Sequence, residues 1–195
     1  MLYTLRDVTV DFRRVEGIWR NLVYLQKASV ILVVCTAAAI AAPAQTFTTL
    51  FTFDGTDGSV PNGGLIRATD GDFYGTTSSG GAGGSGTVFK ITPEGTLTTL
   101  YSFCSQTNCI DGKNPELGLI QATDGNFYGT TFSGGANGAG TVFKITLGGT
   151  LTTLHSFNST DGANPLAGLV QATDGDLYGT TYGEGIARVR SSRSQ

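Results

Sequence analysis

The stretch A-T-D-G-D-F-Y-G-T-T at residues 68–77 decides the fold, because it occurs three times. It returns as A-T-D-G-N-F-Y-G-T-T at 122–131 and as A-T-D-G-D-L-Y-G-T-T at 172–181. Self-similarity at a fixed period of roughly 20–50 residues is the signature of repeat architectures. The sequence is therefore a tandem repeat with a unit of about fifty residues.

Two further blocks recur in the same order. T-V-F-K-I-T stands at 87–92 and again at 141–146, and L-T-T-L stands at 97–100 and 151–154, with an earlier copy, F-T-T-L, at 47–50. The second unit is the longest, and its extra residues lie between Phe103 and Leu119. We place the units at 47–96, 97–150 and 151–184, within a repeat region that spans 45–184.

Each unit predicts short strands rather than helices. The first four expected strands are 65–69, 73–77, 86–92 and 96–103, the last of which runs into the second unit. Asp70-Gly71 is a tight hairpin signal, and Pro93 to Gly95 forms the next turn. Four strands per fifty residues are typical of a β-propeller blade, which must stack on its neighbours to bury both faces. The predicted fold is all-β, with two complete blade-like units and a partial third.

These blocks resemble a known family. The pattern D-G-x-[FL]-Y-G-T-T, then G-T-V-F-K-I-T, then G-T-L-T-T-L-x-S-F is similar to the Gloeo/Verruco (GloVer) tandem repeat over residues 46–182. Members are bacterial secreted proteins often called choice-of-anchor proteins. The resemblance implies an extracytoplasmic propeller-like repeat protein, with room for a C-terminal sorting element. It implies no catalytic residues.

Composition excludes several classes of protein. Glycine makes up 29 of 195 residues, about twice the usual share of ~7%, which would destabilise a helical bundle. Charged residues are 14% of the chain, and the net charge is -3. Between 46 and 184 there are four basic and twelve acidic residues, a net charge of -8. An acidic surface does not favour nucleic acid or anionic lipid as a partner.

The first 44 residues have the layout of an export signal. Lys27 precedes an uncharged run at 28–42, and Ala42-Pro43-Ala44 is a small-x-small cleavage pattern. We expect cleavage after Ala44 and an extracytoplasmic location: secreted, periplasmic or at the cell surface. The alternative is a retained membrane anchor, and only through this uncleaved segment would the protein contact a membrane.

Cys104 and Cys109 lie in the enlarged part of the second unit. An exported chain enters an oxidising compartment, where two nearby cysteines can pair. A zinc site is disfavoured, since no further cysteine or nearby histidine completes four ligands. We predict a Cys104–Cys109 disulfide and no metal or other cofactor.

Recurring polar residues are expected to serve the fold, since an active site would use a residue once. The acids at 70, 124 and 174 fit Asx-type turns better than a calcium site. Tyr74 and its counterparts fit blade packing. Among residues that break the pattern, His155 is interpreted as a tolerated substitution without a partner, and Arg67 as a surface exchange for Gln121 and Gln171. The sequence offers no catalytic, cofactor-binding or metal-binding constellation.

The blade pattern stops after Thr181, and residues 185–195 form an Arg/Ser-rich tail. A truncated or frameshifted reading frame, or an anchoring tail, would explain the change. Open strand edges favour self-association. The predicted function is a non-enzymatic scaffold, part of a larger propeller, with a structural role or with an unknown protein or glycan at the cell surface as its partner. The alternative is part of a glycosidase or lyase acting on extracellular polysaccharide.

Overall fold

The computed structural model describes residues 45–183 and 185–189. The chain divides into two units, Met1–Thr48 and Thr49–Gln195, and the three β-sheets of the described residues belong to the second. The predicted export segment and its cleavage site at Ala44 lie outside the described residues, so both stay predictions.

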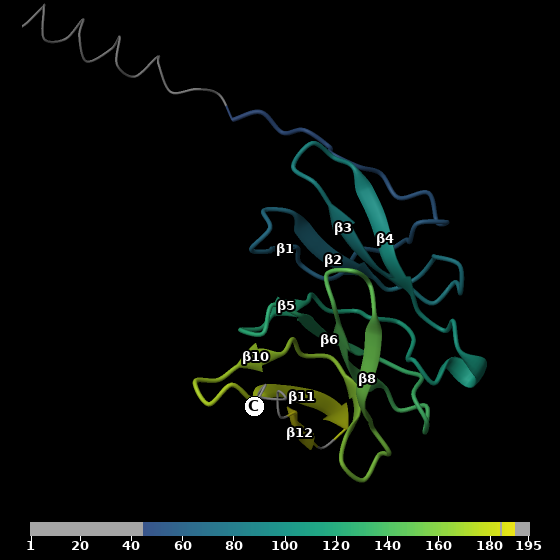
Figure 1. Cartoon of the computed structure of the whole chain (residues 1–195). Helices are drawn as coiled ribbons and strands as arrows, with labels where there is room; N and C mark the ends of the chain where they lie inside the picture. Colours follow the sequence, from purple (N-terminus) through teal and green to yellow (C-terminus); the bar gives the residue numbers. More distant parts are fainter. Residues whose placement is uncertain (1–44, 184, 190–195) are drawn as a thin grey trace, which may run out of the picture. The chain divides into compact units, whose positions relative to one another are not determined.

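The first two sheets are copies of one another (Figure 1). Each is antiparallel, with its four strands in sequence order. The first sheet contains β1 (Ile66–Arg67), β2 (Phe73–Thr77), β3 (Thr87–Ile91) and β4 (Leu97–Ser102). The second contains β5 (Ile120–Gln121), β6 (Phe127–Thr131), β7 (Thr141–Ile145) and β8 (Leu151–Ser156). Sequential order in an antiparallel four-stranded sheet is the organisation of a propeller blade, as the repeat predicts.

The third sheet corrects the expectation that the blade pattern ends before residue 185. It contains β9 (Ala163–Pro165), β10 (Val170–Gln171), β11 (Leu177–Gly183) and β12 (Gly185–Val189). β12 pairs with β11 so that Leu177 faces Val189, as Phe73 faces Ile91 in the first sheet. Ile-Ala-Arg-Val at 186–189 therefore stands where Val-Phe-Lys-Ile stands elsewhere. In the sequence a single residue separates these strands, where the first two units have a glycine-rich stretch, and this difference in spacing hides the relationship.

Hairpin turns are set by the recurring Asp-Gly pairs. The carboxylate of Asp70 accepts a hydrogen bond from the backbone N–H of Asp72, and the same bond recurs at Asp124 and Asp174. This is the Asx turn that the sequence predicts. Gly112 shows why one turn glycine cannot be replaced: its φ is +94°, and a Cβ there would lie 2.5 Å from the Thr131 hydroxyl.

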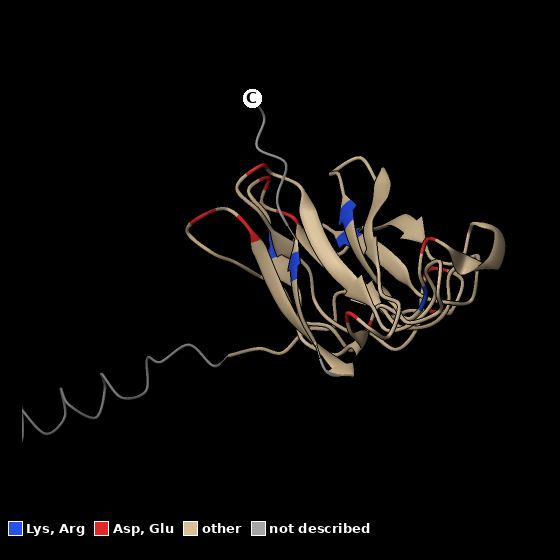
Figure 2. Cartoon of the chain, turned by 90° about the horizontal axis from the view of Figure 1, so that it is seen from below, with Lys and Arg blue, Asp and Glu red and all other residues tan. Residues whose placement is uncertain are grey.

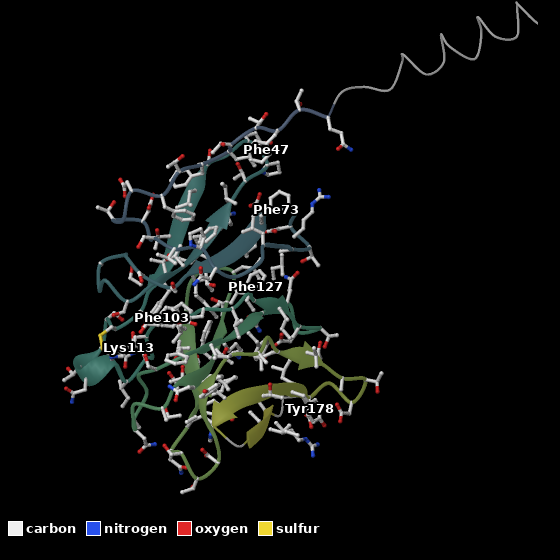
Figure 3. All side chains as sticks on the ribbon, turned by 180° about the vertical axis from the view of Figure 1, so that it is seen from behind. Phe47, Phe73, Phe103, Lys113, Phe127 and Tyr178 are labelled. Carbon is white, nitrogen blue, oxygen red and sulfur yellow. A yellow bond between two sulfur atoms is a disulfide. The ribbon has the colours of Figure 1, made fainter. Side chains whose placement is uncertain are left out.

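The hydrophobic cores lie between sheets rather than within them. The first core joins sheets one and two, and Tyr74 of β2 stacks on Phe127 of β6 with ring centroids 4.1 Å apart. Figure 3 shows Phe103 and Phe127, both of this core, from behind. The second core joins sheets two and three through Tyr128, Val142, Phe157, Leu169 and Leu177. Each sheet thus stabilises its neighbour, as expected for stacked repeats.

Charged side chains follow the same division between strands and turns. Every described acidic residue lies outside the strands, whereas Arg67, Lys90, Lys144 and Arg188 lie on them (Figure 2). The helical part of the described chain is one short 3-10 turn, η1 (Thr107–Cys109). Within the same residues, no helix is both long and apolar enough to span a membrane.

Candidate functional site

A row of aromatic side chains runs along the interfaces between sheets. Phe53 packs edge-on against Phe89 of β3, and Phe103 packs in the same way against Phe143 of β7, with centroids 5.1 Å apart in both pairs. Phe157 is the next member of the row. The residue that should face it is Ala187 of β12, because Ala187 pairs with Gly179 as Phe143 pairs with Gly129.

The small side chain at this position contributes to a cavity of about 410 Å³ beside Phe157. The cavity lies between the end of the second sheet and β12, which is the last strand of the third sheet. Its lining is apolar apart from three residues: Leu154, His155, Phe157, Asp161, Ile186, Ala187, Arg188 and Val189. The hollow is open to solvent, and its lining combines apolar and polar groups.

His155 has a partner, which corrects its interpretation as an unpartnered substitution. Its Nε2 lies 3.0 Å from Oδ2 of Asp161, and its ring packs edge-on against Phe157. The second unit has the same arrangement with different chemistry, since the Tyr101 hydroxyl donates to Asp111 at 2.8 Å. Aligning His155 with Tyr101 and Asp161 with Asp111 would have revealed the pair from the sequence.

The two carboxylates of this position differ in environment. Asp111 is fully buried and also accepts hydrogen bonds from the backbone N–H and hydroxyl of Ser105. Asp161 is exposed. A hydrogen bond from the backbone N–H of Asn158 and the nearby His155 lower the pKa of Asp161, so it is an anion at neutral pH. The carboxylate can orient the imidazole and accept a further hydrogen bond at the rim of the cavity.

Arg188 closes the other side of the rim and is already engaged. It pairs with Asp176 and lies over the ring of Tyr178 at 5.8 Å. Lys90 and Asp72 form the equivalent pair in the first sheet, 2.6 Å apart. The Arg188 guanidinium at the rim is therefore held by the carboxylate of Asp176, which directly precedes β11.

The recurring acids are occupied by structural contacts. In each sheet a tyrosine hydroxyl donates to the turn carboxylate that precedes it by four residues: Tyr74 to Asp70, Tyr128 to Asp124 and Tyr178 to Asp174. Burial, followed by the carboxylate of Asp70, raises the pKa of Tyr74, and the pKa of Tyr128 is raised in the same way. The described residues contain no group of three or more His, Cys, Asp or Glu side chains that could hold a metal ion.

The two predicted disulfide residues are paired. Cys104 and Cys109 form a disulfide across η1, in the enlarged loop between β4 and β5. This loop also carries Ser105 and ends at the buried Asp111. The disulfide thus closes a small loop whose Ser105 bonds the carboxylate of Asp111, at a distance in sequence from the cavity at His155.

The glutamines of β5 and β10 make a contact between sheets that reasoning from the sequence missed. Gln121 accepts from the backbone N–H of Thr69 at 3.0 Å and donates to its hydroxyl, so it ties the second sheet to the first. Gln171 makes both bonds with Thr123. Arg67, at the same position of the first sheet, bonds its own turn at Gly71. The sequence did contain a signal for this contact, since the glutamine at 121 and 171 and the threonine at 69 and 123 both recur.

These features define a class: an all-β repeat protein of stacked, four-stranded, propeller-type sheets. The chain belongs to the Gloeobacter/Verrucomicrobia repeat family, whose model matches residues 36–189. No curated protein matches the sequence.

Solved structures provide distant likenesses. Streptogramin B lyase is similar with a TM-score of 0.44 and 15% identity, over 74% of this chain and 44% of the lyase. A structural-genomics protein described as a putative gluconolactonase is similar with a TM-score of 0.48 and 17% identity. The similarity covers 68% of this chain and 46% of the gluconolactonase chain. The chain thus spans less than half the length of either protein.

Proposed function

We propose that this protein is an exported, non-enzymatic repeat scaffold that has a structural role or binds a protein or glycan at the cell surface. One observation carries the proposal: the polar residues that recur from unit to unit make contacts that hold the sheets. Asp70 and its counterparts accept from a turn amide and a tyrosine, and Gln121 and Gln171 join adjacent sheets. The recurring polar groups therefore stabilise the turns and the packing of the sheets, as expected for a scaffold.

Two features support an extracytoplasmic location. The Cys104–Cys109 disulfide fits an oxidising compartment, and disulfides are rare in the reducing cytosol. The segment at 28–44 has the layout of a cleaved export signal.

Mass spectrometry of the exported protein tests the location. We expect a mature chain that begins at Gln45 and gives no signal in a thiol titration under denaturing, non-reducing conditions. A chain that keeps Met1 in the cytoplasmic fraction, or that shows two reactive thiols after export, contradicts the proposal.

The alternative, a polysaccharide hydrolase or lyase, has one observation in its favour, the His155–Asp161 pair at the rim of a cavity. Incubation of the exported protein with surface polysaccharides, followed by assays for new reducing ends and for unsaturated sugars, separates the two. The scaffold proposal expects retention of polysaccharide or protein without turnover. Turnover that disappears in His155→Ala but not in the matched Tyr101→Phe variant establishes the enzyme.

A further inference from the structure

The first described residues carry the sequence of a fourth strand that has no sheet. F-T-T-L-F-T-F at 47–53 aligns with L-T-T-L-Y-S-F at 97–103 and with L-T-T-L-H-S-F at 151–157. The latter two contain β4 and β8, whereas residues 45–54 form no strand. Phe53 still packs on Phe89 as Phe103 packs on Phe143. The segment thus keeps a side-chain contact of a fourth strand without the ladder.

The third sheet, in contrast, has an edge at which a fourth strand could pair. Within the described residues β12 pairs with β11 alone, whereas β3 and β7 each pair with a fourth strand. Ile186 of β12 is 78% exposed, although its counterparts Val88 and Val142 are fully buried. An exposed edge with an apolar side chain on it is a template for another strand.

The two end faces of the described stack expose apolar positions that are buried wherever two sheets meet. Leu65, on the free side of the first sheet, is 56% exposed, while its counterparts Leu119 and Leu169 are buried against the preceding sheet. The free side of the third sheet exposes Ile186, where Val88 and Val142 are covered by the following sheet. The face that starts the stack therefore matches the face that ends it.

Side-chain sizes at the cavity fit the missing strand. In the first and second sheets a phenylalanine of the third strand (Phe89, Phe143) lies diagonally from a leucine of the fourth (Leu97, Leu151). In the third sheet the position of that phenylalanine is occupied by Ala187, and the segment 47–53 offers Phe47, 95% exposed, in place of the leucine. A large residue on the strand complements a small one in the cavity, which conserves volume.

We propose that two copies of the chain associate head to tail, and that residues 47–53 of each copy form the fourth strand of the other copy's third sheet. By the register of β3 with β4, Phe51 pairs with Ile186, Thr49 with Ala187 and Phe47 with Val189. Phe47 then fills the cavity beside Phe157.

Two copies fit the size of a closed assembly. The described residues of one chain form three sheets, so the same residues of two copies form six, which lies within the range of about 4 to 8 blades of closed propellers. Head-to-tail contacts generate rings when the rotation closes, and closure removes the exposed edges. This inference does not rest on the scaffold proposal, since either function is compatible with it.

Disulfide trapping tests the register directly. The product of the full coding sequence, as the cell processes it, carries Thr49→Cys with Ala187→Cys and is oxidised. We expect a covalent dimer on a non-reducing gel. The control variant, Thr49→Cys with Thr152→Cys, should remain a monomer on the gel. An intramolecular crosslink in the first variant, or an equal dimer yield in the control, overturns the proposal.

The mass in solution provides the second measurement. Light scattering should give twice the chain mass for the unmodified protein. Ile186→Asp should weaken the dimer on the order of tenfold or more, because it places a charge at the paired edge. Leu147→Asp, also at an exposed apolar position but in the β7–β8 turn, should leave the mass unchanged. A strict monomer, larger open assemblies, or a dimer indifferent to Ile186→Asp would refute the model.

Discussion

At the scale of single residues, carboxylates set the pH dependence of stability. Asp70 has a lowered pKa, first because the Tyr74 hydroxyl donates to it. For Asp124, burial acts in the opposite direction, but hydrogen bonds from Asn126 and Tyr128 outweigh it and the pKa is also lowered. Both carboxylates prefer the ionised form in the folded state more than in the unfolded state.

The sign of the effect follows from linkage. A group with a lowered folded pKa stabilises the fold fully above its unfolded pKa, about 3.9 for Asp, and loses that contribution as the pH falls through the folded value. We therefore expect a constant free energy of unfolding between neutral pH and about pH 5, and a steady decrease below about pH 4. Denaturant titrations across this range measure it. In Asp124→Asn the decrease should be shallower, and greater stability of the unmodified protein at low pH contradicts the assignment.

The glutamine contact between sheets is a second residue-scale test. Gln171→Ala removes two hydrogen bonds to Thr123, and we expect a loss of about 1 kcal/mol in the free energy of unfolding. The matched control is Arg67→Ala, at the same position of the first sheet, where the side chain bonds only the local turn carbonyl. Equal losses in the two variants, measured by urea unfolding, would show that the contact between sheets contributes nothing.

At the scale of elements, β12 corresponds to β3 and β7 in backbone register but lacks their aromatic residue. Ala187→Phe introduces the ring that packs on Phe103 and Phe53 in the other interfaces. In a monomeric background carrying Ile186→Asp, this change should raise the free energy of unfolding by about 1 kcal/mol, because it fills part of the cavity. Thermal melting of both variants measures the difference, and a lower melting temperature with the added ring contradicts the expectation.

In the dimer the same substitution should act in the opposite direction. The introduced ring and the partner's strand would compete for one volume, and overpacking costs about 1–3 kcal/mol. We expect Ala187→Phe to weaken association and Phe47→Leu to rescue it, since the leucine recreates the pairing of the first two sheets. Failure of the rescue, with both single variants unchanged in mass, would place the cavity outside the interface.

At the scale of the whole molecule, the part of the chain that the structure describes leaves both end faces of the stack uncovered, so its stability should depend on association. Repeat stability is approximately a sum of unit and neighbour contributions, and an uncovered end lacks one neighbour. A protein that dimerises only when folded melts at a temperature that rises with concentration. We expect a rise on the order of a few degrees per tenfold increase in concentration, and none for Ile186→Asp. Calorimetry at several concentrations decides this.

The sequence by itself determined the architecture. Three copies of the 68–77 block, in register with T-V-F-K-I and L-T-T-L, predict four antiparallel strands per unit, and the first two sheets follow this order. Local chemistry sufficed there, because an Asp-Gly pair between two short strand-forming segments specifies a hairpin without distant contacts. The Cys104–Cys109 pairing was predictable for the same reason, since the two residues are close in sequence.

Only the tertiary structure decided the rest, because it depends on residues that meet across sheets. His155 acquires Asp161 through a loop, Gln171 reaches Thr123 of the preceding sheet, and β12 is recognised by its ladder with β11 rather than by its residues. The cavity beside Phe157 exists because Ala187 lies opposite it, a relation that only strand pairing establishes. Hydrogen bonds and packing between stacked sheets join positions about fifty residues apart, and a single sequence does not show which of those positions are in contact.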